Sequence, residues 1–214
     1  MITTIDKNSK IFIISLPRTG TTSVCALFLS LGFKTAHTAF TRYSFDQAQV
    51  IADTPVYCDY RQLDQLFPGS KFIYLDRSLN EWLPSISQLL VRMVPRLVRP
   101  DGFHPVMQRC FSEVFSQLTI DSAKDFQHLS ACYERHQQQV NQYFFTQKQR
   151  LLCVDIAKED ALPRMLEFLN ITKPVVSMPH LNQSGKIAQW KKINHPLKVS
   201  SNISGKGGRL FLEY

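Results

Sequence analysis

The stretch Leu16-Pro17-Arg18-Thr19-Gly20-Thr21-Thr22-Ser23 decides the fold of this chain. It follows the apolar run Ile11-Phe12-Ile13-Ile14 and precedes an amphipathic segment that begins at Val24. The order of strand, small-residue loop and helix directs free backbone N–H groups at one point, where the helix dipole also favours negative charge. The sequence therefore predicts an anion-binding loop, with phosphate as the first ligand to consider.

The loop departs from the pattern of nucleoside triphosphatases. That pattern, G-x-x-x-x-G-K-[ST], requires a lysine where Thr21 stands. Thr22 keeps the final hydroxyl, but the positive charge sits at Arg18, two residues before Gly20. A shorter loop with a displaced cation favours a phosphate that carries a group other than another phosphate.

Two blocks of the sequence resemble one known family. Pro17-Arg18-Thr19-Gly20-Thr21-Thr22 is similar to the 5′-phosphosulfate loop of sulfotransferases that use 3′-phosphoadenosine-5′-phosphosulfate (PAPS), whose pattern is P-[KR]-[ST]-G-T-[ST]. Lys71-Phe72-Ile73-Tyr74-Leu75-Asp76-Arg77, followed by Ser85, resembles the family's 3′-phosphate motif, a strand that ends in Arg with a Ser eight residues later. The similarity covers roughly residues 10–182 and continues through the phrases 53–56, 66–71, 151–156, 167–169 and 179–182.

The resemblance implies a sulfotransferase that moves a sulfuryl group from PAPS to a hydroxyl or amine of a small molecule or glycan. The loop from Thr19 to Ser23 would hold the 5′-phosphosulfate, Arg18 would neutralise charge on the bridging oxygen, and Arg77 with Ser85 would bind the 3′-phosphate. The implied cofactor-binding residues are Arg18, Thr19, Gly20, Thr21, Thr22, Ser23, Arg77, Ser85, Lys206 and Arg209.

Some positions depart from the family pattern. Many members place a Trp that stacks on adenine where Ser23 stands here. Lys206 and Arg209, within Gly205-Lys206-Gly207-Gly208-Arg209, match the family's late Arg-Lys-Gly loop only loosely, and Ser184-Gly185-Lys186 competes with them for that role.

The acceptor must lose a proton, so a general base should lie near the loop. His37 has the better unperturbed pKa for neutral pH, whereas Asp53 lies in the more family-like phrase Asp53-Thr54-Pro55. The candidate catalytic residues are therefore Arg18, His37 and Asp53. His136 and Trp82 are expected to be core residues.

Charge and cysteine content narrow the class of protein. The net charge is +8, but the basic residues are spread along the chain, so we expect no nucleic-acid partner and attribute part of the charge to binding of PAPS. The five scattered cysteines and the polar N-terminus favour a reduced, cytoplasmic protein. No apolar run approaches the ~20 residues of a membrane span. No carboxylate pair or Cys-x-x-Cys motif indicates a metal site.

The coarse layout predicts an α/β fold, three layers α/β/α with a mostly parallel central sheet and a P-loop-like strand–loop–helix. Length and hydrophobic content indicate one domain, 1–214, with a cofactor core at about 10–90 and 150–182 and a helical acceptor-side insertion at about 92–146. We expect strands at 10–16, 34–37, 55–58, 71–76 and 150–156, and helices at 22–31, 46–52, 60–67, from 78, 105–119, 122–146 and 160–169.

Local signals add detail to two of these helices. Ser78 and Glu81 form the sequence of a capping box, and Pro84 is expected to kink the helix that follows. In the helix at 122–146, the predicted apolar face is Phe126, Leu129, Tyr133, Val140 and Phe144.

Two other functions remain open at this level. One is a P-loop nucleotide kinase or hydrolase, because Asp155 ends a strand where the magnesium-binding acid of such an enzyme would fall. The other is a non-catalytic nucleotide-binding relative, which would keep the fold and lack the general base. Acceptor specificity is expected in residues 38–60 and 92–125.

Overall fold

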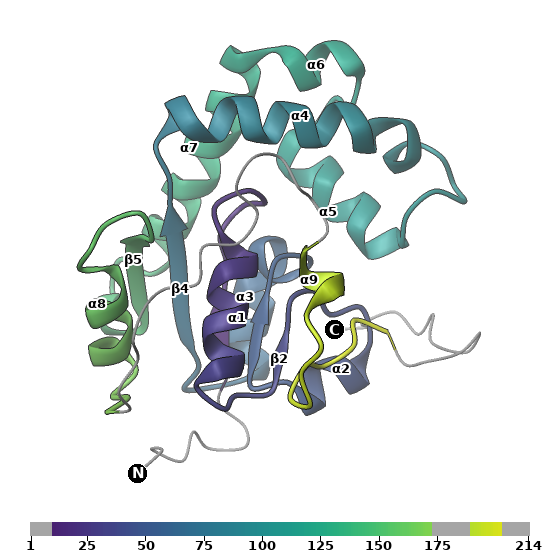
Figure 1. Cartoon of the computed structure of the whole chain (residues 1–214). Coiled ribbons are helices and arrows are strands. Elements are labelled where there is room, and N and C mark those ends of the chain that lie inside the picture. The colour runs from purple at the N-terminus through teal and green to yellow at the C-terminus, as the bar shows by residue number, and fades with distance from the viewer. Residues whose placement is uncertain (1–9, 173–188, 203–214) are drawn as a thin grey trace.

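A five-stranded parallel sheet forms the centre of the protein (Figure 1). The computed structural model describes residues 10–172 and 189–202. The strand order is β2-β3-β1-β4-β5, and every pairing is parallel. The strands are β1 (Ile11–Ile13), β2 (Thr35–Ala36), β3 (Val50–Ala52), β4 (Lys71–Asp76) and β5 (Leu151–Asp155).

Helices cover both faces of the sheet, which confirms the predicted three-layer α/β/α fold. Alternate residues of the strands point to opposite faces, so Ile13 packs with α1 and α8, while Phe12 packs with α3 and the end of α7. The helices are α1 (Thr21–Ser30), α2 (Arg42–Gln47), α3 (Val56–Leu66), α4 (Leu79–Leu97), α5 (Pro105–Phe115), α6 (Ile120–Lys124), α7 (Phe126–Tyr143), the 3₁₀ turn η1 (Lys148–Arg150), α8 (Ala161–Phe168) and α9 (Gln189–Lys192).

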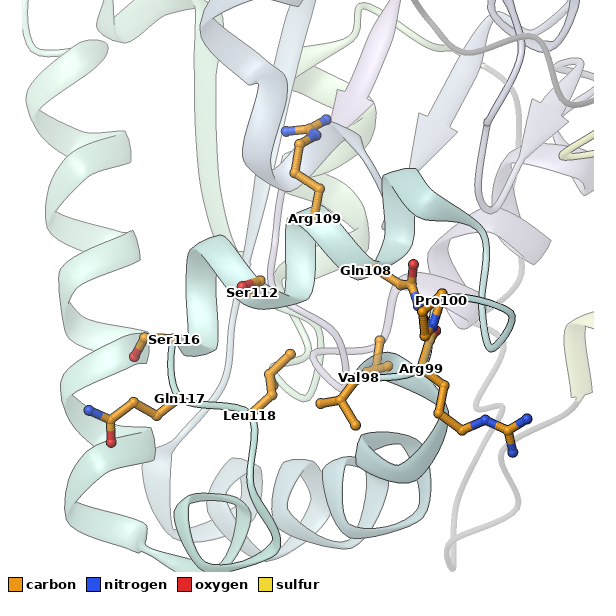
Figure 2. Close-up of a pocket in the computed structure, with 10 residues that line it drawn as sticks. Val98, Arg99, Pro100, Gln108, Arg109, Ser112, Ser116, Gln117 and Leu118 are labelled. Atoms are coloured by element: carbon orange, nitrogen blue, oxygen red, sulfur yellow. The ribbon is translucent and has the colours of Figure 1, made fainter.

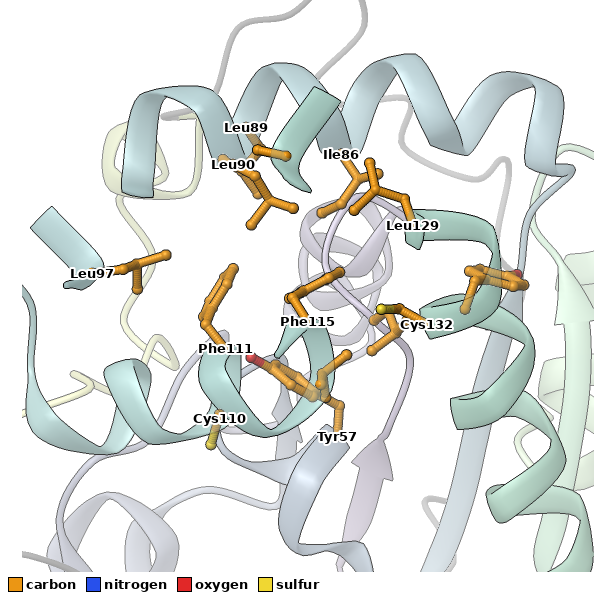
Figure 3. Close-up of a cluster of buried hydrophobic side chains, with 14 of the residues drawn as sticks. Tyr57, Ile86, Leu89, Leu90, Leu97, Cys110, Phe111, Phe115, Leu129 and Cys132 are labelled. Carbon is orange, nitrogen blue, oxygen red and sulfur yellow. The ribbon is translucent and has the colours of Figure 1, made fainter. Parts of the chain in front are cut away.

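A further apolar cluster lies beyond the carboxyl ends of the strands. Helices α4, α5, α6 and the first half of α7 enclose it, and Tyr57 reaches it from α3 (Figure 3). Leu16 of the loop and Trp82 of α4 also belong to this cluster. The helices α4, α5, α6 and α7, here called the helical layer, are therefore built directly onto the end of the sheet where the loop emerges.

The middle of the predicted layout was wrong between residues 46 and 58. Residues 50–52 form the buried strand β3 rather than part of a helix, and 55–58 open helix α3 rather than a strand. The buried side chains Val56, Tyr60 and Leu63 recur at helical spacing on that element. This period outweighs the strand preference of its first residues.

Several helix details also differ from expectation. The predicted capping box is absent, since Ser78 precedes α4 without a side-chain cap and Oε2 of Glu81 lies 3.6 Å from Nε of Arg77. Helix α4 includes Pro84 within one element, and the kink expected there stays a prediction. The helices expected at 105–119 and 122–146 are the three elements α5, α6 and α7. Phe126, assigned to the apolar face of the last, is exposed.

The segment 189–202 lies along the outer edge of β2 (Figure 1). The Thr35 N–H donates to the Leu197 carbonyl and the Val199 N–H donates to the Thr35 carbonyl, both at 2.9 Å. These bonds pair the edge strand with a chain segment far away in sequence. None of the helices within the described ranges is both long and apolar enough to span a membrane.

Candidate active site

The carboxyl ends of four neighbouring strands gather the candidate residues. His37 follows β2, Asp53 follows β3, the loop follows β1 and Arg77 follows β4. Ligands of open parallel sheets bind at this edge, beyond the strand ends. The structure therefore brings together the loop after β1 and the Arg77 motif after β4, which lie far apart in the sequence.

The backbone of the loop has the conformation that exposes N–H groups. Arg18 has φ 73°, and Gly20, the N-cap of α1, has φ 102°. The first N–H groups of a helix have no intrahelical acceptor, so those of α1 remain directed out of its N-terminus. The positive φ favours glycine at position 20, where a Cβ would also lie 2.2 Å from Cδ1 of Ile156 and would displace that side chain.

Side chains hold three successive carbonyl oxygens of the loop. The Thr19 hydroxyl donates to the Leu16 carbonyl at 2.8 Å, the Trp82 indole N–H donates to the Pro17 carbonyl at 2.9 Å, and Arg77 Nη1 donates to the Arg18 carbonyl at 2.6 Å. Two of these donors come from the β4–α4 segment. Because its carbonyls are already bound, the loop keeps its shape without a ligand.

Three arginines gather beside the loop. Arg18 Nε donates to the Ser85 hydroxyl at 2.8 Å, so the predicted pair Arg77 and Ser85 both contact Arg18. Burial, then the charges of Arg77 and Arg92, lower the pKa of the Arg18 guanidinium. Clustered like charges are unfavourable unless an anion binds among them. The sequence reasoning missed Arg92, although it follows Ser85 by seven residues and so lies on the same face of α4.

The second candidate group lies on the β2 side of the loop. Nε2 of His37 is 2.9 Å from the Thr22 hydroxyl and 3.3 Å from the Thr21 hydroxyl. Burial lowers the pKa of His37, Asp53 raises it and Lys198 lowers it. The histidine is therefore mainly neutral at neutral pH, and its Nε2 either donates to or accepts from a threonine hydroxyl.

Asp53 occupies a strained turn at the end of β3. Its φ is 55°, and its Oδ1 accepts from the Thr54 N–H at 2.7 Å and from the Thr54 hydroxyl at 3.1 Å. Both of these bonds use the same carboxylate oxygen, Oδ1. Asp53 is close enough to His37 to act on its pKa, so the two base candidates share one side of the site.

The remaining predicted positions divide into two groups. Thr19, Thr21, Thr22 and Ser23 are all buried around the N-terminus of α1. Lys206 and Arg209 lie outside the described residues, as does the competing segment 184–186.

As expected, Trp82 and His136 are buried in the core. All five cysteines carry free thiols, and no cluster of metal-ligating residues is found in the part of the chain that the structure describes.

An open pocket of about 690 Å³ lies in the helical layer, between the end of α4, helix α5 and the turn after it (Figure 2). It falls within residues 92–125, where acceptor specificity was expected. Leu97 on its wall is twelve residues beyond Ser85, which corresponds to ~18 Å along α4. The pocket is therefore distant from the loop. We place the candidate site at the loop, because the charged groups converge there.

Comparison with known proteins identifies one family. A family model described as a sulfotransferase domain matches residues 39–187, more than half of the chain. The match begins after the loop and His37, and it includes Asp53, Arg77 and Ser85. No curated protein matches the chain.

Proposed function

The chain belongs to the sulfotransferase domain family, and we propose that it transfers a sulfuryl group from PAPS to a hydroxyl or amine of a small molecule or glycan. The observation that carries this proposal is the set of side chains around the loop. Arg18, Arg77 and Ser85 are joined by hydrogen bonds at the N-terminus of α1. A nucleotide with phosphates at both its 5′ and 3′ positions suits such a site.

We assign the donor to the β1–β4 side of the site. The N–H groups at the start of α1, with the hydroxyls of Thr21 and Thr22, would hold the 5′-phosphosulfate. Arg77 and Ser85 would bind the 3′-phosphate. Each already contacts Arg18, so the nucleotide would bind to a prearranged group of donors. Lys206 and Arg209 remain candidates for the same phosphate.

The proposed transfer is a displacement at sulfur. The acceptor oxygen or nitrogen forms a bond to sulfur while the bond from sulfur to the bridging oxygen breaks, and 3′,5′-diphosphoadenosine leaves with the electron pair. Arg18 would stabilise the charge that develops on the leaving phosphate. The acceptor's proton would pass to Asp53 or His37, which lie together on the β2–β3 side.

The acceptor would enter from the side opposite to the 3′-phosphate. In the strand order, β3 and β2 lie on one side of β1, and β4 lies on the other. We propose one domain in which residues 10–90 and 150–182 bind the cofactor, and the helices at 92–146 contribute to acceptor binding. The pocket between α4 and α5 is a candidate for the outer part of a long acceptor.

Titration calorimetry with two nucleotides tests the proposed donor. We expect 3′,5′-diphosphoadenosine to bind without metal and more tightly than ATP with Mg²⁺. We also expect sulfuryl transfer from PAPS to survive chelation of divalent ions, because the transferred group carries less charge than a phosphoryl group. Tighter binding of ATP with Mg²⁺, or loss of transfer in EDTA, would instead support a nucleotide kinase.

Single substitutions distinguish the two candidates for the general base. Loss of the general base should lower turnover ~10²–10⁴-fold while affinity for 3′,5′-diphosphoadenosine is retained. We therefore expect this result for one of Asp53→Asn and His37→Ala, measured by steady-state kinetics and calorimetry. Lys148→Ala is the control, because Lys148 is an exposed residue of η1, outside the segments assigned to the cofactor and the acceptor. Wild-type turnover in both variants would remove both residues from the mechanism.

A further inference from the structure

The segment 189–202, here called the C-terminal strap, contacts both β2 and the chain that follows it. In addition to its two bonds with Thr35, the strap accepts from the Phe40 N–H through the Ser201 carbonyl at 2.9 Å. The Ser44 hydroxyl donates to the Ser200 carbonyl at 2.7 Å. These bonds fix the strap along the edge of the sheet nearest to His37.

The strap places an indole ring against His37. The ring centroids of Trp190 and His37 are 5.5 Å apart, with an interplanar angle of 32°. The Lys198 ammonium lies 4.9 Å from the Trp190 ring centroid and donates to the carbonyls of Trp190 and Ile193 at 2.7 and 2.8 Å. Lys198 therefore holds the short helix α9 and the indole in one arrangement.

The same imidazole contacts the loop. With Trp190 against its ring, His37 directs Nε2 toward the hydroxyls of Thr22 and Thr21 at the start of α1. A continuous series of contacts thus runs from Lys198 through Trp190 and His37 to two of the hydroxyls assigned to the phosphosulfate.

We propose that Trp190 and Lys198 are positioning residues for the transfer site, which hold the His37 ring so that its Nε2 stays against the Thr21 and Thr22 hydroxyls. The proposal rests on the proposed function for its kinetic consequences. It applies whether His37 takes the proton itself or orients Thr22. In both cases the reactive geometry depends on where the imidazole lies, and a displacement of about 1 Å costs ~10²-fold in rate.

The charges around His37 agree with this role. Burial lowers its pKa, Asp53 raises it, and Lys198 of the strap lowers it. The strap therefore acts on His37 in two ways, because it covers the ring and adds a nearby positive charge. Both effects favour the neutral imidazole.

The test compares Trp190→Ala with Trp190→Phe, which retains an aromatic ring. In Trp190→Ala we expect the pKa of His37, followed by NMR of the imidazole, to rise as water reaches the ring. We also expect kcat to fall ~10–100-fold, and the acidic limb of the pH–rate profile to move to higher pH. Trp190→Phe should restore most of both properties. Lys192→Ala, an exposed change on the same short helix, is the control.

Lys198→Gln keeps the backbone pairing of the strap but removes the charge and shortens the side chain that holds α9, so it covers the case in which Trp190→Ala fails to fold. It should also raise the pKa of His37. An unchanged His37 titration and unchanged kcat in the folded variants would overturn the proposal. If the wild-type protein transfers no sulfuryl group, the proposed function fails, while the NMR titration still decides what the strap does to His37.

Discussion

Arg77 makes two contacts that serve different purposes. Its Nη1 holds the Arg18 carbonyl and so shapes the loop, while its Nε lies 3.6 Å from the exposed carboxylate of Glu81. An ion pair so exposed contributes little, so Glu81 competes weakly with a phosphate for the guanidinium. The guanidinium can therefore support the loop and bind an anion at once.

For Arg77→Ala we expect loss of discrimination between 3′,5′-diphosphoadenosine and adenosine 5′-monophosphate. A charge-assisted contact contributes ~1.5–3 kcal/mol, so the ratio of the two affinities should fall roughly 10- to 150-fold. Calorimetry with both nucleotides measures this ratio, which is insensitive to any general loosening of the loop. Arg99→Ala should leave the ratio unchanged. Equal affinities in the wild-type protein would exclude a 3′-phosphate site.

Arg18 is expected to contribute more to the transition state than to binding. Charge grows on the bridging oxygen only as sulfur departs, so Arg18→Ala should lower turnover at least ~10-fold more than it lowers affinity for 3′,5′-diphosphoadenosine. Arg18→Lys should recover part of the rate, because an ammonium keeps the charge but not the planar fork. Measuring kcat and the affinity for 3′,5′-diphosphoadenosine in the same variants shows whether Arg18 acts mainly in the transition state or in binding. Equal losses would make Arg18 a binding residue only.

At the level of helices, one ion pair with a buried carboxylate joins α5 to α3, which packs on the sheet. Arg109 of α5 donates to both carboxylate oxygens of Asp59 on α3, at 2.9 and 2.6 Å. Asp59 is 2% exposed, whereas Glu113, the other partner of Arg109, is half-exposed. In Figure 2, Arg109 extends away from the other pocket residues. This pair therefore holds α5 against α3.

Arg109→Met should destabilise the protein by ~3–5 kcal/mol, because it leaves a buried carboxylate without its guanidinium. Glu113→Gln is the matched control and should cost less than ~1 kcal/mol. Urea denaturation measures both values. The double variant Asp59→Leu with Arg109→Met should be more stable than Arg109→Met alone. If it is not, the loss of unfolding free energy comes from the lost packing of the Arg109 side chain and not from the Asp59 carboxylate that loses its guanidinium.

Across the whole molecule, continuous apolar runs made three strands predictable. Strands 10–16, 71–76 and 150–156 were recognisable because each contains four consecutive apolar residues. β3 was missed because its apolar run, Val50-Ile51-Ala52, has only three residues, and periodicity discriminates poorly over so short a run.

The candidate site was predictable where it follows a local motif or the end of an expected strand, as His37 does. Arg18, Arg77 and Ser85 belong to recognisable phrases, and the structure joins them. Arg92 and Trp190 reach the site by the packing of α4 and by backbone pairing at the edge of β2, and neither has a local sequence pattern.

Stability of the whole fold should depend on pH through His136, which links the helical layer to the sheet. Its Nε2 is 2.8 Å from the Tyr57 carbonyl, and its ring stacks on Tyr74 of β4. Since the Nε2–H donates to that carbonyl, Nδ1 carries no proton, and it has no partner among the described residues. Protonation would bury a charged N–H without an acceptor. This burial lowers the pKa of His136 to about 4.

Because the unfolded chain has the higher pKa, ~6.5, it binds the proton first as the pH falls. The stabilisation from neutral His136 is therefore complete above pH ~6.5 and is lost between there and pH ~4, by roughly 3 kcal/mol. Other groups also contribute to the pH dependence of stability, so the informative quantity is the difference between two variants. His136→Gln can still donate to the Tyr57 carbonyl but does not titrate. Its unfolding free energy, measured in urea from pH ~7 to ~4.5, should fall less than that of the wild-type protein. Parallel curves would show that His136 takes up its proton equally in the folded and unfolded states, and so that its pKa is not lowered by folding.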